Sequence, residues 1–263
     1  MTDASTPDER ARFEARRMRG ALFRDVDLSG SRFEHADLSG VTMRGVELVD
    51  VEIHGEIWNL TVNGVDVVPL VNAELDRRDP DRAKMRPTDP DGFREAWDIV
   101  ERLWDQTVER ARGFDPEQLH ESVDGEWSFI ETLRHLVFAS DAWIRRGIMG
   151  DPQPWDALDL PWDQMPDTPG IPRDRQARPS LDEVLVLRRD RMLTMRQLVD
   201  DLTAEELASQ TDPVQGPGWP QSRSYPVREC LSVILNEEWH HRLFAERDLD
   251  VLESRGAQSG KDA

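Results

Sequence analysis

The sequence predicts an α+β protein of two domains, in which a short coil built on a five-residue repeat precedes a four-helix bundle. Near the N-terminus large apolar residues return at every fifth position, which fits neither a helix nor a strand. After a proline-rich charged segment, apolar residues recur at spacings of three and four along four stretches, as in amphipathic helices. The predicted boundaries are 13–75 for the repeat with a hairpin cap, 76–92 for a linker and 93–253 for the bundle.

Composition excludes several classes of partner. The 263 residues include 33 basic and 53 acidic ones, a formal charge of −20, which repels phosphate backbones and anionic membrane surfaces. The single cysteine, Cys230, cannot form an internal disulfide, and the acidic N-terminus lacks the positive and apolar regions of a secretory signal. No apolar run approaches the roughly 18 residues of a membrane span. We therefore expect a cytoplasmic protein that binds neither nucleic acid directly nor membranes.

The repeat extends from Ala21 to about residue 60. A smaller residue stands two positions before each of the first seven large ones. A sustained period of five implies a coil with several short sides per turn. Short strands that happen to keep a five-residue step are the alternative. The large positions are Phe23, Leu28, Phe33, Leu38, Met43, Leu48, Ile53 and Trp58.

Two features separate the repeat from the helices. Asn63-Gly64 lies between alternating apolar residues and predicts a two-residue hairpin, which could close the open end of the coil. Residues 76–92 contain three prolines and alternating charge without an apolar period, and this predicts the connection between the domains.

The four helices have start or stop signals of their own. Ser128 and Ser180, each followed by Glu three residues later, predict capping boxes at the second and third helices. Pro226 suits the first position of the fourth, and Gly113 ends the first. The predicted helices span 93–111, 128–149, 180–202 and 226–253.

Two irregular segments, 150–179 and 211–225, contain tryptophans. Loops this long are often lids or binding elements, so these tryptophans could wall a pocket at one end of the bundle. Equally, Trp155, Trp162 and Trp219 could pin long connections to the surface.

Polar residues stand on the fourth helix where apolar ones are expected. The face that carries Cys230, Ile234 and Phe244 also carries Glu237 and His241 in its middle. An unpartnered buried carboxylate costs several kcal/mol, so a partner is required. A spacing of four places both side chains on one face of the helix, about 5–6 Å apart at Cβ, which suits chelation of one ion.

His135 is the third candidate ligand, in an apolar stretch of the second helix. A lone histidine there is usually a hydrogen-bonded core residue. Together with Glu237 and His241 it makes a His-Glu-His set, the ligand count of an open zinc site. The sequence predicts a divalent metal, zinc first, with nickel, manganese or iron as alternatives.

Three short motifs resemble the DinB/YfiT-like superfamily, which includes mycothiol-dependent maleylpyruvate isomerase. They are GluTrpSer at 126–128, ArgHisLeu at 134–136 and GluGluTrpHisHis at 237–241, and the resemblance covers about 93–252. It implies a four-helix bundle whose metal is held by His135, Glu237 and His241. The pattern Glu-x-Trp-x-His is closest to the isomerase-like branch. Glu237 with His240, at a spacing of three, is the alternative pair.

The five-residue repeat resembles the pentapeptide-repeat family. The clearest copy is AlaAspLeuSerGly at 36–40. The resemblance implies a right-handed β-helix of about two coils, with the small and large positions pointing inward. Its open ends should lean on another element or on a second copy of the chain, as in a homodimer.

The resemblance implies a metal-dependent enzyme in which a low-molecular-weight thiol binds as thiolate and attacks a small-molecule substrate. An S-transferase or isomerase in detoxification is the leading hypothesis, and the sequence assigns no catalytic or thiol-binding residue. The alternative is a non-catalytic protein in which the ion locks two helices and the repeat binds a partner or dimerises. Mimicry of DNA by the acidic repeat ranks last, because two coils present little duplex length.

Overall fold

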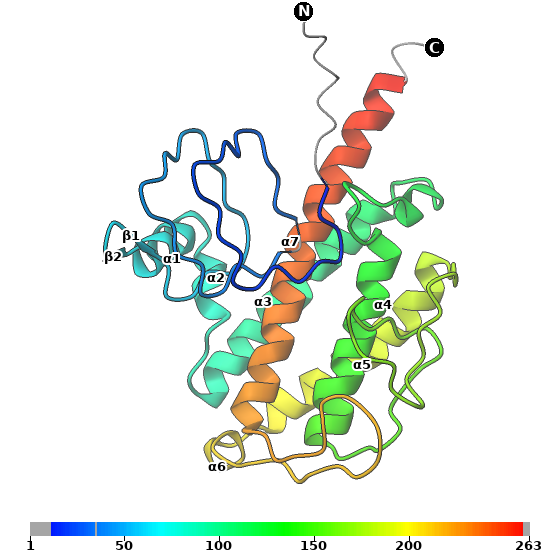
Figure 1. The fold of residues 1–263 in the computed structure, drawn as a ribbon. Coiled ribbons are helices and arrows are strands. Elements are labelled where there is room, and N and C mark those ends of the chain that lie inside the picture. The colour runs from blue at the N-terminus through cyan, green and yellow to red at the C-terminus, as the bar shows by residue number, and fades with distance from the viewer. Residues whose placement is uncertain (1–11, 35, 260–263) are drawn as a thin grey trace, which may run out of the picture. The chain divides into compact units, whose positions relative to one another are not determined.

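The computed structural model describes residues 12–34 and 36–259, with side chains as far as 256. The chain divides after Glu56 into two compact units. Figure 1 shows the first as a winding coil and the second as mainly helical.

The five-residue period of the first unit is present in its backbone. A left-handed backbone conformation recurs at every fifth described residue. At Gly30, φ is +71°, and the Ser31 amide donates to the Leu28 carbonyl at 3.0 Å. Positive φ at the third position of a four-residue turn is what a type II turn requires, and glycine adopts it without steric cost. The left-handed positions are Ala15, Gly20, Asp25, Gly30, Gly40, Gly45, Asp50 and Gly55.

The predicted β-helix is not confirmed. The described residues of this unit contain no strand, so ordinary short strands are absent there too. The large apolar side chains, expected to point into a core, are exposed: Leu28 and Leu38 to 47% and Phe33 to 64%. A coil of a solenoid buries its inner side chains mainly against neighbouring coils, and about two coils offer few neighbours.

The hairpin prediction is confirmed. Strands β1 (Thr61–Val62) and β2 (Val65–Asp66) pair antiparallel, with Val62 opposite Val65. Asn63 and Gly64 have φ values of +51° and +81°, as both central residues of a type I′ turn require. The hairpin groups with the second unit, whereas the sequence places it in the repeat domain.

Residues 76–92 are largely helical, where the sequence predicts a linker. Helix α1 (Val68–Arg78) runs into the segment, α2 (Pro80–Lys84) lies within it, and α3 begins at Pro90. Proline is tolerated in the first turn of a helix, because the N–H that it lacks has no intrahelical partner there. Pro80 and Pro90 therefore begin helices.

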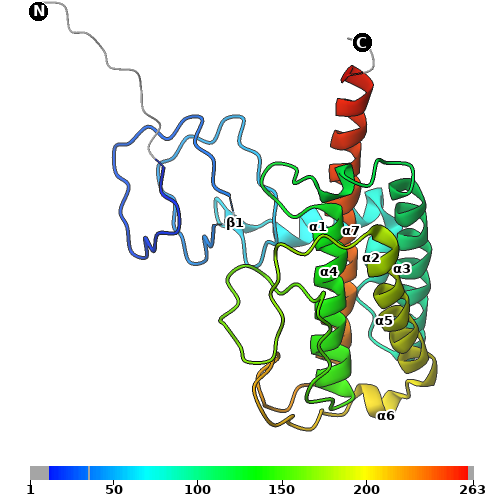
Figure 2. The ribbon, with the colours of Figure 1, turned by 90° about the vertical axis from the view of Figure 1, so that its right-hand side faces the viewer.

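The remaining helices form the bundle. Helix α4 packs against α5 and α7, and α3 packs against the same two (Figure 2). Both predicted capping boxes, at Ser128 and Ser180, are present. The core between the helices includes Phe93, Leu133 and Leu231, all buried. The elements are α3 (Pro90–Ala111), a 3₁₀ turn η1 (Gln118–His120), α4 (Phe129–Ser140), a π-helix η2 (Asp141–Ile148), α5 (Leu181–Asp201), α6 (Ala204–Leu207) and α7 (Val227–Ser259).

The long irregular segments are pinned by their tryptophans. Trp155 stacks on Phe138 of α4 at 5.7 Å between ring centroids, and Trp162 meets Trp219 edge to face at 4.9 Å. The 150–179 segment also contains a cavity of about 340 Å³. Eight residues from Pro161 to Arg173 line it, and Trp155, Trp162 and Trp219 are not among them. The ring contacts of Trp155 and Trp162 are those that the pinning alternative predicts. Among the described residues, no helix is long and apolar enough to cross a bilayer.

Candidate metal centre

His135, Glu237 and His241 meet between α4 and α7. The Glu237 Oε2 atom lies 3.2 Å from His135 Nε2 and 3.1 Å from His241 Nε2. One candidate ligand atom from each of the three residues lies within 4.8 Å of those of the other two. Glu237 and His241 are one turn apart on α7, and His135 faces them from the buried middle of α4.

A backbone carbonyl orients His135. Its Nδ1 atom lies 2.9 Å from the carbonyl oxygen of Leu160 in the 150–179 loop. Because a carbonyl only accepts, Nδ1 carries the proton in this hydrogen bond. Without a metal, Nε2 donates to the Glu237 carboxylate, which can only accept. A metal ion would take the place of that Nε2 proton, and with Nδ1 still protonated the Nε2 lone pair would be the one that binds it.

Glu237 is held in its anionic form. Burial by itself raises the pKa of this carboxyl group. Hydrogen bonds and charge interactions with His135 and His241 outweigh burial, so the pKa falls well below the ordinary value. A carboxylate flanked by two imidazole nitrogens is a suitable donor set for a divalent cation.

The donor atoms also fit a metal in spacing. Ligands at about 2.0–2.1 Å from a tetrahedral ion lie about 3.3 Å apart, and the nitrogen–oxygen separations here are 3.1 and 3.2 Å. Among the described residues no fourth His, Cys, Asp or Glu joins the cluster. Three protein ligands would leave one tetrahedral position for water or a substrate atom.

Aromatic rings lie against both histidines. The centroid of the Trp127 ring lies 4.5 Å from that of His135 and 5.8 Å from that of His241. Trp127 and His241 are stacked, with 10° between their ring planes. Phe244, one turn beyond His241, meets it edge to face at 6.0 Å and is 41% exposed. An apolar surrounding of this kind lowers the local dielectric and strengthens charge interactions at the cluster.

The alternative pair Glu237 and His240 does not form the cluster found among the described residues. Adjacent helical residues are about 100° apart around the axis, so His240 and His241 face different directions. The His240 ring lies 6.5 Å from that of Phe244.

Sequence reasoning missed two buried ion pairs beside this site. Arg188 makes two 2.7 Å hydrogen bonds to the Glu238 carboxylate, and both side chains are at most 3% exposed. Arg191 makes two bonds, of 2.9 and 2.8 Å, to Asp141. Both arginines continue the spacing of three and four of the buried stripe of α5, and this was the signal available in the sequence.

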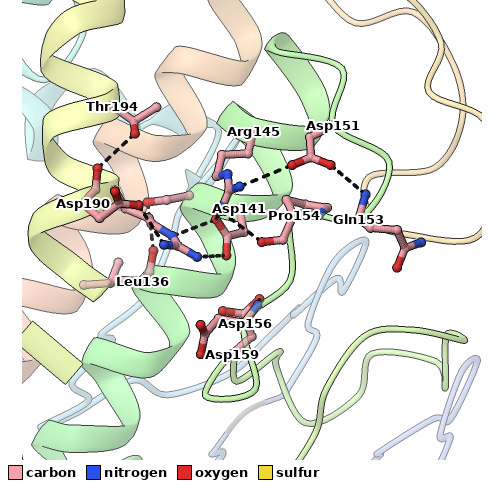
Figure 3. A network of polar contacts seen from close by, with 12 residues as sticks. Leu136, Asp141, Arg145, Asp151, Gln153, Pro154, Asp156, Asp159, Asp190 and Thr194 are labelled. Carbon is pink, nitrogen blue, oxygen red and sulfur yellow. Dashed lines mark hydrogen bonds and ion pairs between the residues drawn. The ribbon is translucent and has the colours of Figure 1, made fainter. Parts of the chain in front are cut away.

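The carboxyl group of Asp159 is also buried, and it lies near that of Asp141 (Figure 3). Its Oδ2 atom accepts a hydrogen bond from the Asp156 amide at 3.2 Å, and no partner for Oδ1 is found in the described part of the chain. Burial first, and then the charge of Asp141, raise the pKa of Asp159 well above 3.8.

We expect Asp159→Asn to be increasingly more stable than the wild type as pH rises. The folded protein keeps the Asp159 proton at pH values where the unfolded chain has released it. Above the unfolded pKa, stability therefore falls with pH until the folded pKa is passed. Asparagine cannot ionise and removes this loss. Urea unfolding at pH 5 and pH 9 measures the difference, with Asp167→Asn on the surface as the control. Parallel pH profiles for the wild type and Asp159→Asn would contradict the expectation.

In comparisons with known proteins, two family models match the chain, one over each of its two parts. A family model described as the DinB superfamily matches residues 99–245, more than half of the chain. A model of pentapeptide repeats, in eight copies, matches residues 9–45, of which 9–11 and 35 lie outside the described residues. No curated protein and no solved structure matches. With a pentapeptide repeat at its N-terminus, the chain belongs to the DinB superfamily.

Proposed function

We propose that the protein is a metal-dependent enzyme that uses a low-molecular-weight thiol, as an S-transferase or isomerase in detoxification. The observation that carries the proposal is the convergence of His135, Glu237 and His241, with no fourth protein ligand among the described residues. Zinc suits two imidazoles and a carboxylate. Mycothiol, the thiol of the isomerase-like branch that the motifs resemble, is the first candidate. A thiol-dependent reaction fits the reducing cytoplasm, where we place it.

The protein's own thiol is unsuited to the chemistry. Cys230 is fully buried, and burial raises its pKa to about 12. The thiol is the protonated, weakly nucleophilic form at neutral pH. A reaction that needs a thiolate must therefore take it from a co-substrate.

Each residue of the centre has a separate role in this proposal. A bound divalent ion would lower the pKa of a thiol and stabilise its thiolate. Glu237 offers a negative charge to the ion, and the Leu160 carbonyl keeps His135 in the tautomer that leaves Nε2 available. Trp127 restricts water beside both imidazoles.

Metal content and thiol binding test the proposal. We expect about one zinc per chain by elemental analysis, and loss of it in the triple variant His135→Ala, Glu237→Ala, His241→Ala. In cobalt-substituted protein, adding mycothiol should produce a sulfur-to-cobalt charge-transfer band. Unchanged metal stoichiometry in the triple variant would remove the metal proposal, and a cobalt spectrum indifferent to thiols would remove the thiol proposal alone.

The exposed apolar residues of the repeat favour a second candidate, a non-catalytic protein whose repeat dimerises. Phe23 and Phe33 are 54% and 64% exposed. Residues 12–56 contain seven basic and nine acidic residues, so two copies of the repeat repel each other far less than their whole chains, at −20 each, would. Sedimentation of the full chain beside Phe23→Ser, Phe33→Ser tests the dimerisation that this candidate requires. A wild-type dimer that the variant loses supports this candidate, and a monomer at all concentrations excludes it.

A further inference from the structure

We infer that Arg134 is a positioning residue for the metal centre, which it serves by fixing the loop whose Leu160 carbonyl orients His135. The inference rests on the proposed metal binding. Arg134 precedes His135 on α4, and its side chain is fully buried.

Arg134 holds the loop at three places. Its Nε donates to the Leu158 carbonyl at 2.8 Å, its Nη2 to the Asp174 carbonyl at 2.6 Å and its Nη1 to the Ala177 carbonyl at 3.3 Å. The three acceptors are main-chain groups, so the contacts fix the path of the loop itself. A guanidinium presents its donors in a rigid planar fork, and it can hold three separate carbonyls in one geometry.

Two adjacent residues of α4 thus clamp two nearby carbonyls of the loop. Arg134 binds the oxygen of Leu158, and His135 binds that of Leu160, two residues further on. The loop between η2 and α5 has no helix or strand to order it, so its conformational entropy opposes a fixed Leu160 carbonyl. Without Arg134 we expect that carbonyl to sample other positions and His135 to lose its fixed ring plane and its Nδ1 hydrogen bond.

Burial of a guanidinium is costly, so a buried arginine needs compensating contacts. A second buried arginine, Arg146, serves as a matched comparison for Arg134. Arg146 on η2 is equally buried and also binds main-chain carbonyls, at 3.0 Å for Pro152 and 2.9 Å for Gly216. Pro152 lies near the start of the same loop, but none of the carbonyls that Arg146 holds falls within 158–160. Arg146 therefore shares the structural role of Arg134, and of these two arginines Arg134 is the one linked to a metal ligand.

The test compares Arg134→Lys with Arg146→Lys in the full chain. Lysine keeps the charge and loses the fork, so both variants should unfold at lower urea concentration than the wild type. Loss of a partner that orients a metal ligand typically weakens binding about 10–100-fold. We expect that loss of zinc affinity in Arg134→Lys, and less than about threefold loss in Arg146→Lys, in competition with a chromophoric chelator. Wild-type affinity in folded Arg134→Lys, or equal losses in both variants, would overturn the inference.

A second measurement separates the inference from metal binding. In the metal-free protein, the Nδ1 proton of His135, which is hydrogen-bonded to the Leu160 carbonyl, should exchange slowly with water by NMR in the wild type and in Arg146→Lys, and rapidly in Arg134→Lys. If the wild type binds no zinc but shows this pattern, the metal proposal fails and the positioning role stands. Slow exchange of this proton in Arg134→Lys overturns the role. Should Arg134→Lys not fold, Arg134→Gln, which removes the buried charge, is read by the same criteria.

Discussion

Glu238→Leu is expected to destabilise the metal-free bundle by about 3–5 kcal/mol, the cost of leaving a buried charge without its partner. Arg188, which is 3% exposed at its side chain, would lose both of its bonds to the Glu238 carboxylate. Urea unfolding followed by helical circular dichroism measures the effect, because the described part of the repeat contains no helix. A chelator in all samples keeps metal bound at the neighbouring Glu237 from entering the comparison.

Two controls define the origin of that loss. Glu117→Gln breaks an exposed ion pair with Arg178 and should change stability by less than about 1 kcal/mol. The double variant Arg188→Met, Glu238→Leu removes both charges and should recover most of the stability that Glu238→Leu loses. A double variant as unstable as the single one would show that packing, and not the unpaired charge, is the cause.

Zinc is expected to stabilise the bundle by about 2.7 kcal/mol at a free concentration 100-fold above its Kd, since it binds the folded centre and not the dispersed ligands of the unfolded chain. The stabilisation should grow with the logarithm of zinc concentration and disappear on chelation. Urea unfolding across a zinc series measures it.

Glu237→Ala should abolish this zinc dependence, because it removes the carboxylate that faces both imidazoles. His120→Ala, which alters a histidine outside the cluster, should keep it. Zinc dependence that survives in Glu237→Ala would place the ion elsewhere.

Local sequence patterns were sufficient for most of the architecture. The bundle helices and the hairpin follow from apolar spacing, capping residues and Asn63-Gly64, all of which act within a few residues of the chain. The helices within 76–92 were not predicted, because proline in the first turn of a helix and proline in a linker look alike without knowledge of the packing. Local patterns also could not predict how well the repeat buries its apolar side chains, because that burial depends on how many coils stack.

The three candidate ligands could be named from the sequence because each breaks the apolar pattern of its own helix. Glu237 and His135 are 102 positions apart in the sequence, and only the tertiary structure shows that their side chains meet. The same holds for Arg188 with Glu238, 50 positions apart, and for Arg134 with its loop carbonyls. Spacing within a helix decides which residues face inward, whereas the partner of each buried charge depends on how separate helices and loops pack, and no short-range pattern encodes that.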